Sequence, residues 1–236
     1  MKMSVKDVLR ELQSKGSARN VKGMARYGIV SVKAYGVSAP AMRALAKKIG
    51  TDHALALKLW RTGVHEARVL GVLVGDPDKV TPGLMNAWVK DFDNWALCDA
   101  ACSVLFDKTP YAVGKAFEWT KRKEEFVRRA GFVVMAALAV HDKKAPDNLF
   151  LRFLPVIERG SSDEQNYVRK AVNWALRQIG KRNSNLNRAA LRTAQKIQRM
   201  DSSVARWIAG DAIRELESKA VQKRLAGRAR SLSVKT

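Results

Sequence analysis

Apolar residues recur along most of this chain at the three- and four-residue spacing of amphipathic α-helices. Stretches of strictly alternating apolar and polar residues, which are typical of strands, are absent. The pattern predicts helices over residues 3–15 and 18–28, and a third that begins at Ser38 and ends at Gly50. We therefore expect an all-α fold.

Local signals predict where further helices begin or break. Thr51 is the expected N-cap of the helix that follows Gly50. Thr81-Pro82 and Thr109-Pro110 each combine a capping hydroxyl with a proline, which is favoured in the first helical turn. Pro155 lies inside the helical pattern of residues 148–158, and we expect it to kink or break that helix.

The helices come in pairs, and one member of each pair resembles the next. The segments HEARVLGVLV, ALCDAACSVL, FVRRAGFVVM, YVRKAVNWAL and VARWIAGDAI align on Arg68, Cys98, Arg128, Arg169 and Arg206, which are 30, 30, 41 and 37 residues apart. Amphipathic helices can align by chance when they are slid freely, but small residues also recur after each anchor. The spacing favours a right-handed α-solenoid of antiparallel HEAT-like helical hairpins.

No Gly/Ser-rich linker interrupts the chain. We expect a single HEAT-like repeat domain over residues 1–222 and a basic C-terminal tail over residues 223–236, of a kind that is often disordered. Trp60, Trp88 and Trp119 are expected in the core, where most tryptophans lie.

The repeat alignment predicts a shared surface. Positions three before, one after and five after the anchor lie on one helix face. Equivalent faces of successive repeats line one concave surface in a solenoid. This surface is expected to bring together five side chains: Trp95, Asp99, Arg129, Lys170 and Trp174.

The charge of the chain is the strongest indication of its binding partner. The formal net charge is +22, and residues 165–200 hold nine Lys or Arg and no acid. This excess of positive charge could simply make the surface cationic and soluble. The clustering of the charges instead favours a polyanionic partner, either nucleic acid or an anionic membrane. A basic groove that contains aromatic side chains is typical of nucleic-acid binding. Asp99 is unusual there, since it is a lone acid beside Trp95 in a short apolar segment.

Other function classes find little support. The N-terminus has no apolar signal segment, and the longest uncharged apolar run, Ala130–Val140, is shorter than the roughly 20 residues that span a bilayer. Cys98 and Cys102 are too few for a disulfide framework, which favours a reducing cytosol. Three scattered histidines give no zinc spacing, and no glycine-rich nucleotide loop occurs. We expect a monomer without a cofactor.

At specific motifs the chain resembles the AlkD family of HEAT-like-repeat DNA alkylation-repair glycosylases. The motifs are ARYGI at 25–29, YGVSAPAMRALAK at 35–47, LWRTGVHEAR at 59–68, NWALCD at 94–99, FVRRA at 126–130 and RKAVNWALRQIGK at 169–181. By position, the resemblance implies Asp99 as the catalytic aspartate, Trp95 and Trp174 as its partners, Arg129 as the groove arginine and Tyr27 near the DNA. Asn94 and Ala96 depart from the aromatic and the acid that the family often has there.

The resemblance implies hydrolysis of the N-glycosidic bond of N3- or N7-alkylated purines in duplex DNA, as in base excision repair in a bacterial cytosol. The cations expected to hold phosphates are Arg128, Arg169, Lys170, Arg177, Lys181 and Arg182. Two alternatives are open. One is a catalytically silent relative that binds bent, branched or damaged DNA, and the other is an α-solenoid that binds RNA or an acidic protein.

Overall fold

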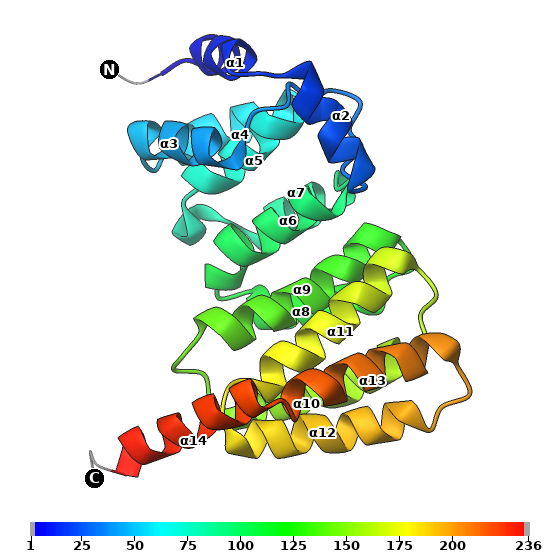
Figure 1. Ribbon diagram of the computed structural model, residues 1–236. Helices are drawn as coiled ribbons and strands as arrows, with labels where there is room; N and C mark the ends of the chain where they lie inside the picture. Colours follow the sequence, from blue (N-terminus) through cyan, green and yellow to red (C-terminus); the bar gives the residue numbers. More distant parts are fainter. Residues whose placement is uncertain (1–2, 234–236) are drawn as a thin grey trace. The chain divides into compact units, whose positions relative to one another are not determined.

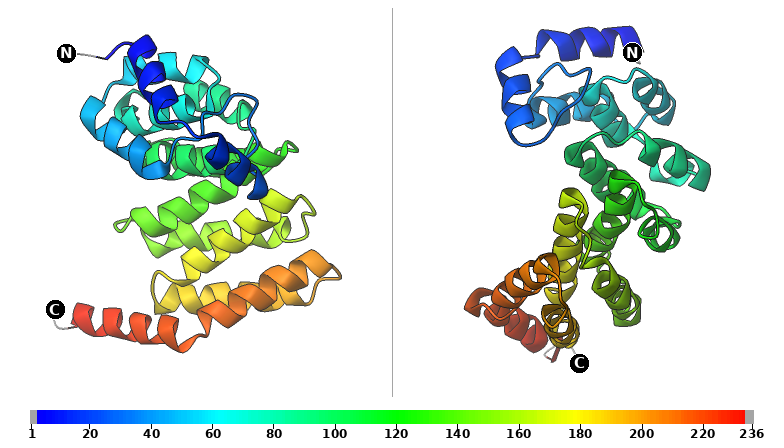
Figure 2. Two further views of the ribbon diagram at one scale, coloured as in Figure 1. Left: turned by 45° about the horizontal axis from the view of Figure 1, so that its top comes forward. Right: turned by 90° about the vertical axis from the view of Figure 1, so that its right-hand side faces the viewer.

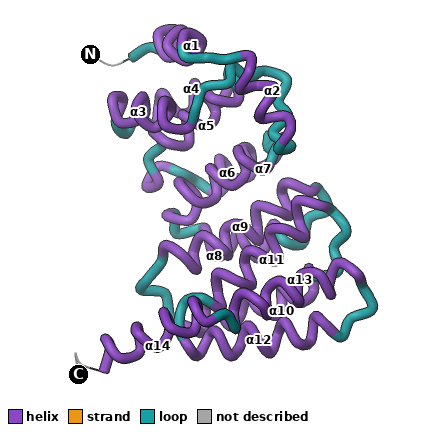
Figure 3. The backbone as a smooth tube through the Cα atoms, in the orientation of Figure 1, coloured by secondary structure: helices purple, strands orange, loops and turns teal. Residues whose placement is uncertain are grey.

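The computed structural model describes residues 3–233, with side chains described through residue 227. Over this range every regular element is a helix, as the purple tube in Figure 3 shows. The contacts divide the chain into two compact units, Met1–Ala112 and Val113–Thr236. The expectation that residues 1–222 form a single domain stays a prediction.

Helix α5 (His65–Val74) is the central element of the first unit (Figure 1). It packs against α1 (Val5–Ser14), α3 (Ala39–Ile49), α4 (His53–Arg61) and α7 (Trp95–Ala100). A β-carbon on Gly71 would lie 3.0 Å from the backbone oxygen of Ala56. Glycine at this position therefore lets α4 and α5 approach each other closely.

The remaining elements of the first unit are short. They are α2 (Ala18–Arg26), η1 (Pro77–Lys79), α6 (Pro82–Lys90), the π-helix η2 (Ala101–Leu105) and the 3-10 helix η3 (Phe106–Lys108). Trp60 and Trp88 stack with ring centroids 3.9 Å apart, and both are buried, as is Trp119. The expectation that these three tryptophans lie in the core is therefore confirmed.

The second unit is built around a pair of long helices. Its elements are α8 (Ala112–Trp119), α9 (Glu125–His141), α10 (Asp147–Gly160), α11 (Asn166–Gly180), α12 (Ser184–Gln198), α13 (Ser203–Leu216) and α14 (Lys219–Ser233). Helix α9 packs closely on α11, and the apolar run within α9 is almost entirely buried. In both views of Figure 2, α14 lies beside α12 and α13 at the C-terminal end of this unit.

The repeat prediction agrees with the order of the helices. The five anchors lie on α5, α7, α9, α11 and α13, so every second helix carries one. The all-α class with helical repeats is thus confirmed. No helix within residues 3–233 is long and apolar enough to cross a membrane.

Several local expectations are confirmed and others are wrong. Thr81 accepts a hydrogen bond from the backbone N–H of Leu84, with Pro82 in the first turn of α6. The cap of α4 is Asp52 rather than Thr51, since the Asp52 carboxylate accepts from the N–H of Leu55.

The expectation at Thr109 is also wrong. Its hydroxyl donates to the carbonyl of Phe106, and α8 begins only at Ala112.

Pro155 does not break α10, which continues from Asp147 to Gly160. Proline removes the hydrogen bond to the carbonyl four residues earlier, that of Leu151. Both Pro155 and Leu151 are exposed, so water can satisfy this carbonyl.

The basic tail expected from residue 223 is helical up to Ser233 as part of α14, which is anchored by buried Val221 and Leu225. Residues 234–236 lie outside the described part of the chain.

Candidate nucleic-acid interface

Helix α7 carries the two residues around which the site was predicted. Asn94 caps this helix, because its side-chain oxygen accepts from the backbone N–H of Leu97 at 3.0 Å. The Asn94 amide also donates to Asp93 at 2.6 Å and lies 3.3 Å from Nδ1 of His65. A polar residue before Trp95 is therefore explained by the way the helix begins.

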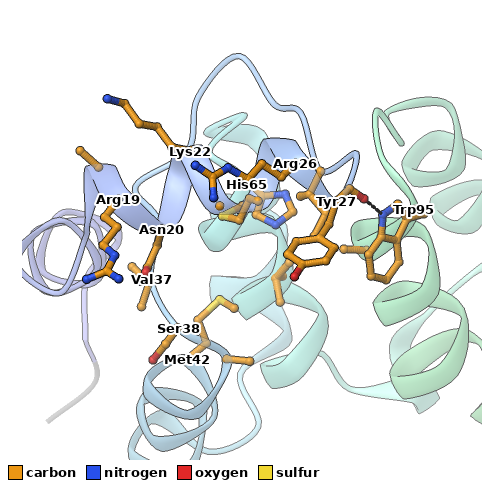
Figure 4. A pocket seen from close by; sticks show the side chains of 17 residues that line it. Arg19, Asn20, Lys22, Arg26, Tyr27, Val37, Ser38, Met42, His65 and Trp95 are labelled. Atoms are coloured by element: carbon orange, nitrogen blue, oxygen red, sulfur yellow. Dashed lines mark hydrogen bonds between the residues drawn. The ribbon is translucent and has the colours of Figure 1, made fainter.

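The indole of Trp95 is held in place by the neighbouring α2 segment. Its Nε1 donates to the carbonyl oxygen of Tyr27 at 2.8 Å, which is the dashed line in Figure 4. Trp95 is half-buried, whereas Tyr27 is 77% exposed at the C-cap of α2. A fixed indole beside a freely accessible phenol ring gives this edge of the first unit two aromatic groups that a ligand can reach.

Asp99 lies in the last turn of α7, four residues after Trp95, and its side chain is half-buried. The π-helix η2 begins two residues later. The Ser103 hydroxyl donates to the Asp99 carbonyl at 2.6 Å, which ties the two helical segments together. Such π-helical insertions occur frequently at functional sites.

In the second unit, α9 and α11 carry the other predicted residues. Arg129 is buried and donates from Nη1 to the carbonyl of Tyr167 at 2.6 Å. The Glu125 carboxylate accepts a hydrogen bond from the backbone N–H of Tyr167 at 2.9 Å. With the Gln178 amide oxygen turned toward the indole, Nε1 of half-buried Trp174 donates to it at 2.9 Å.

These contacts show how each half of the predicted site is supported within its own unit. The joining of Trp95 and Asp99 with Arg129, Lys170 and Trp174 on one surface stays a prediction.

Four of the cations predicted to bind phosphate already have partners within the protein. Arg128 pairs with Asp163 at 3.0 Å, and Arg182 donates to the carbonyls of Ala139 and Ala145. Glu215 accepts from Arg177 and from Lys181, each at 2.6 Å. Burial alone would raise the pKa of Glu215, but these bonds outweigh it and lower that pKa.

These four side chains therefore also hold the helices of the second unit together. Their role in binding phosphate stays a prediction.

Two cations at the start of α11 are accessible and lie beside aromatic rings. Lys170 is exposed, with its Nζ 5.7 Å from the ring centre of Tyr167. The guanidinium of Arg169 lies 5.8 Å from the ring centre of Trp207, an aromatic residue on α13 that is 46% exposed. Trp207 follows its repeat anchor by one place, as Asp99 and Lys170 do, and this register is the signal that could have marked it as a site residue.

Sequence reasoning also missed Glu66, whose side chain is fully buried. Its carboxylate accepts from three consecutive backbone N–H groups, those of Tyr35 at 2.9 Å, Gly36 at 2.6 Å and Val37 at 3.3 Å. Gly36 has a φ of 75°, a conformation that favours glycine. Glu66 thereby fixes the segment that leads into α3.

His65 precedes Glu66 and is also buried. Burial lowers its pKa, and the attraction of Glu66 and Asp93 opposes this only in part. The folded-state pKa therefore lies below the unfolded value of about 6.5. As the pH falls through that value, the unfolded chain takes up a proton that the folded state resists, so the free energy of unfolding falls.

We expect this fall to be smaller in His65→Gln. Urea unfolding of both proteins at about pH 7.5 and about pH 5.5 measures the difference, on either side of the ordinary histidine pKa. His141→Gln, at an exposed position, is the control and should decline as the wild type does. Equal declines in all three proteins would contradict the role of His65.

No group of three or more His, Cys, Asp or Glu side chains is arranged to hold a metal ion in the described part of the chain.

The fold and its accessible aromatic and cationic side chains define a helical-repeat protein with a HEAT-like architecture. A sequence model described as DNA alkylation repair enzyme matches residues 8–216. The chain therefore belongs to the DNA alkylation repair enzyme family, which confirms the resemblance found in its motifs. No curated protein matches the chain.

Among the solved structures with a similar fold is one that matches over most of its length. It has a TM-score of 0.75 and 20% sequence identity, and the match covers 90% of this chain and 95% of that one. It is described as a new family of proteins related to the HEAT-like repeat DNA glycosylases with affinity for branched DNA structures. At this identity the likeness establishes the fold alone.

Proposed function

We propose that this protein is a DNA glycosylase that hydrolyses the N-glycosidic bond of cationic N3- and N7-alkylated purines in duplex DNA. The observation that carries the proposal is the pair on α7. Trp95 is held by the Tyr27 carbonyl, and Asp99 follows one turn later with its side chain half-buried rather than sealed in the core. Membership in the DNA alkylation repair enzyme family supports the same reading.

The chemistry needs one carboxylate. An alkylated purine is already positively charged, so it takes the electron pair of the breaking C1′–N bond and departs as a neutral base without a general acid. Positive charge develops on the sugar, where Asp99 would stabilise it and orient the attacking water. The water oxygen bonds to C1′, and its released proton passes to the carboxylate and then to solvent.

The other predicted residues would serve binding. Trp95 and Trp174 would pack against the deoxyribose of the lesion, where attraction to the rings grows as positive charge develops. Arg129 would serve beside them as the arginine of the groove. Lys170 and Arg169 are the accessible cations that we assign to the flanking phosphates.

A second candidate is a non-catalytic protein that binds branched DNA. The observation that favours it is the similar solved structure, which is described by its affinity for branched DNA. The two candidates differ in whether the protein breaks a bond.

The test is to incubate the protein with a duplex that contains a single 7-methylguanine and to measure abasic-site formation by alkaline strand cleavage. We expect abasic sites with this duplex and none with a matched uracil duplex, because uracil is neutral and needs a proton donor to depart. Release of uracil would contradict the one-carboxylate mechanism. No release from 7-methylguanine, together with tight and salt-sensitive binding of a four-way junction, would favour the second candidate.

A further inference from the structure

A large cavity lies in the first unit between α2 and the helices it faces (Figure 4). Its volume is about 1150 Å³, and its lining includes Met24, Tyr27, Met42, His65 and Trp95. Asp99 does not line it. The cavity thus shares Trp95 with the proposed reaction and extends from it toward α2, away from the carboxylate.

The cavity exists because α2 is attached at its ends and has no buried residue of its own. At one end Ser17 N–H donates to the Tyr35 carbonyl at 2.8 Å, and the Asn20 amide donates to the Gly36 carbonyl at 2.9 Å. At the other end Tyr27 accepts from Trp95. Between these attachments Gly23 and Met24 are only partly buried, and both line the cavity.

Gly23 lies in the middle of this span. It lines the cavity, and a β-carbon added to it would meet no other atom within 4 Å. A β-carbon at this position therefore displaces no neighbour, and the rest of a larger side chain would extend beside the cavity.

The chemistry of the lining suits a nucleotide. The charged groups around the cavity are the cations Arg19, Lys22 and Arg26, and no acid lines it. Figure 4 shows Lys22 extending away from the other lining side chains, whereas Arg26 runs above His65. The inner surface is mostly apolar, and His65, whose pKa is lowered by burial, adds a neutral ring.

We propose that this cavity binds one unpaired nucleotide of DNA, with its base between Tyr27, Met42 and Trp95 and its phosphate on Arg19 and Arg26. Aromatic side chains stack on any base, and arginine pairs with phosphate through two N–H groups. The volume slightly exceeds the roughly 300–1,000 Å³ of pockets for small ligands, which leaves room for a base and its sugar. The inference rests on the proposed function in taking DNA as the partner.

The experiment compares two duplexes that differ only in one extrahelical adenine. Fluorescence anisotropy of labelled DNA gives the affinity of each, and the ratio of the two affinities is the readout. We expect the wild type to prefer the bulged duplex about tenfold, the effect of stacking one base. Gly23→Leu should bring this ratio close to one by narrowing the cavity.

Gly114→Leu is the matched control, because Gly114 is also a helical glycine whose β-carbon would meet no atom within 4 Å, and it lies in the second unit. It should keep the wild-type ratio. Leucine favours helix more than glycine does, so neither variant should unfold at a lower temperature. A wild type without preference, a ratio unchanged in Gly23→Leu, or an equal loss in both variants would overturn the assignment.

Two further arms separate the remaining outcomes. Binding of deoxyadenosine monophosphate as tight as that of the bulged duplex would show that the cavity takes a free nucleotide, which would overturn the assignment to DNA. Release of 7-methylguanine is measured on the same preparations. Release without bulge preference refutes this inference alone, whereas bulge preference without release refutes the glycosylase alone and supports the cavity assignment.

Discussion

Asp99→Asn is expected to slow release of 7-methylguanine from duplex DNA by roughly 10²–10³-fold, the usual loss when one group that stabilises transition-state charge is removed. Asparagine has the shape of aspartate but no negative charge to place against the developing oxocarbenium ion. The half-buried position of Asp99 near the end of α7 makes it accessible to such a sugar. Single-turnover kinetics with excess protein measure the chemical step directly.

The matched control is Asp78→Asn, at an exposed position in the same unit. It should release the base at the wild-type rate. DNA binding by Asp99→Asn should persist, since the change removes a negative charge from a protein that binds a polyanion. A near-normal rate of release in Asp99→Asn would contradict the assigned role, whatever its effect on affinity.

Glu66→Ala is expected to lower the free energy of unfolding by roughly 3 kcal/mol or more, because a buried donor left without a partner costs about 1–3 kcal/mol. The Glu66 carboxylate accepts from the N–H groups of Tyr35, Gly36 and Val37, and alanine offers no acceptor to any of them. The segment they belong to forms one wall of the cavity through Val37. Urea unfolding followed by circular dichroism measures the change.

Two variants sharpen this result. Glu66→Gln keeps one oxygen acceptor and should lose less stability than Glu66→Ala. Glu164→Ala, at an exposed position, should unfold as the wild type does. If Glu66→Ala and Glu164→Ala unfold at the same urea concentration, the three hydrogen bonds do not stabilise the fold as inferred.

Much of the fold follows from local patterns in the sequence. The cap at Thr81 and the glycine end at Gly50 depend on residues within one or two turns of each other, and the repeat anchors follow from comparing one helix segment with the next. The same locality explains the errors. Two adjacent candidates, Thr51 and Asp52, can both cap α4, and only the actual path of the backbone selects Asp52.

For the candidate site, too, some features follow from the sequence and others only from the tertiary structure. The sequence by itself determined that Trp95 and Asp99 lie one turn apart, since helical spacing alone sets this. Only the tertiary structure decided which charges remain accessible. Arg182 meets carbonyls 43 and 37 residues away, and Glu66 meets a segment about 30 residues earlier.

The physical reason is the distance in sequence between the groups that interact. Periodicity reports which face of a helix is apolar, but a charged side chain finds its partner on another helix, at a separation that no local pattern encodes. The cavity under α2 arises likewise from attachments at the two ends of that helix, to Tyr35 and to Trp95. The chain's own pattern thus set the helices, and their packing decided which of its many cations and aromatic rings remain accessible.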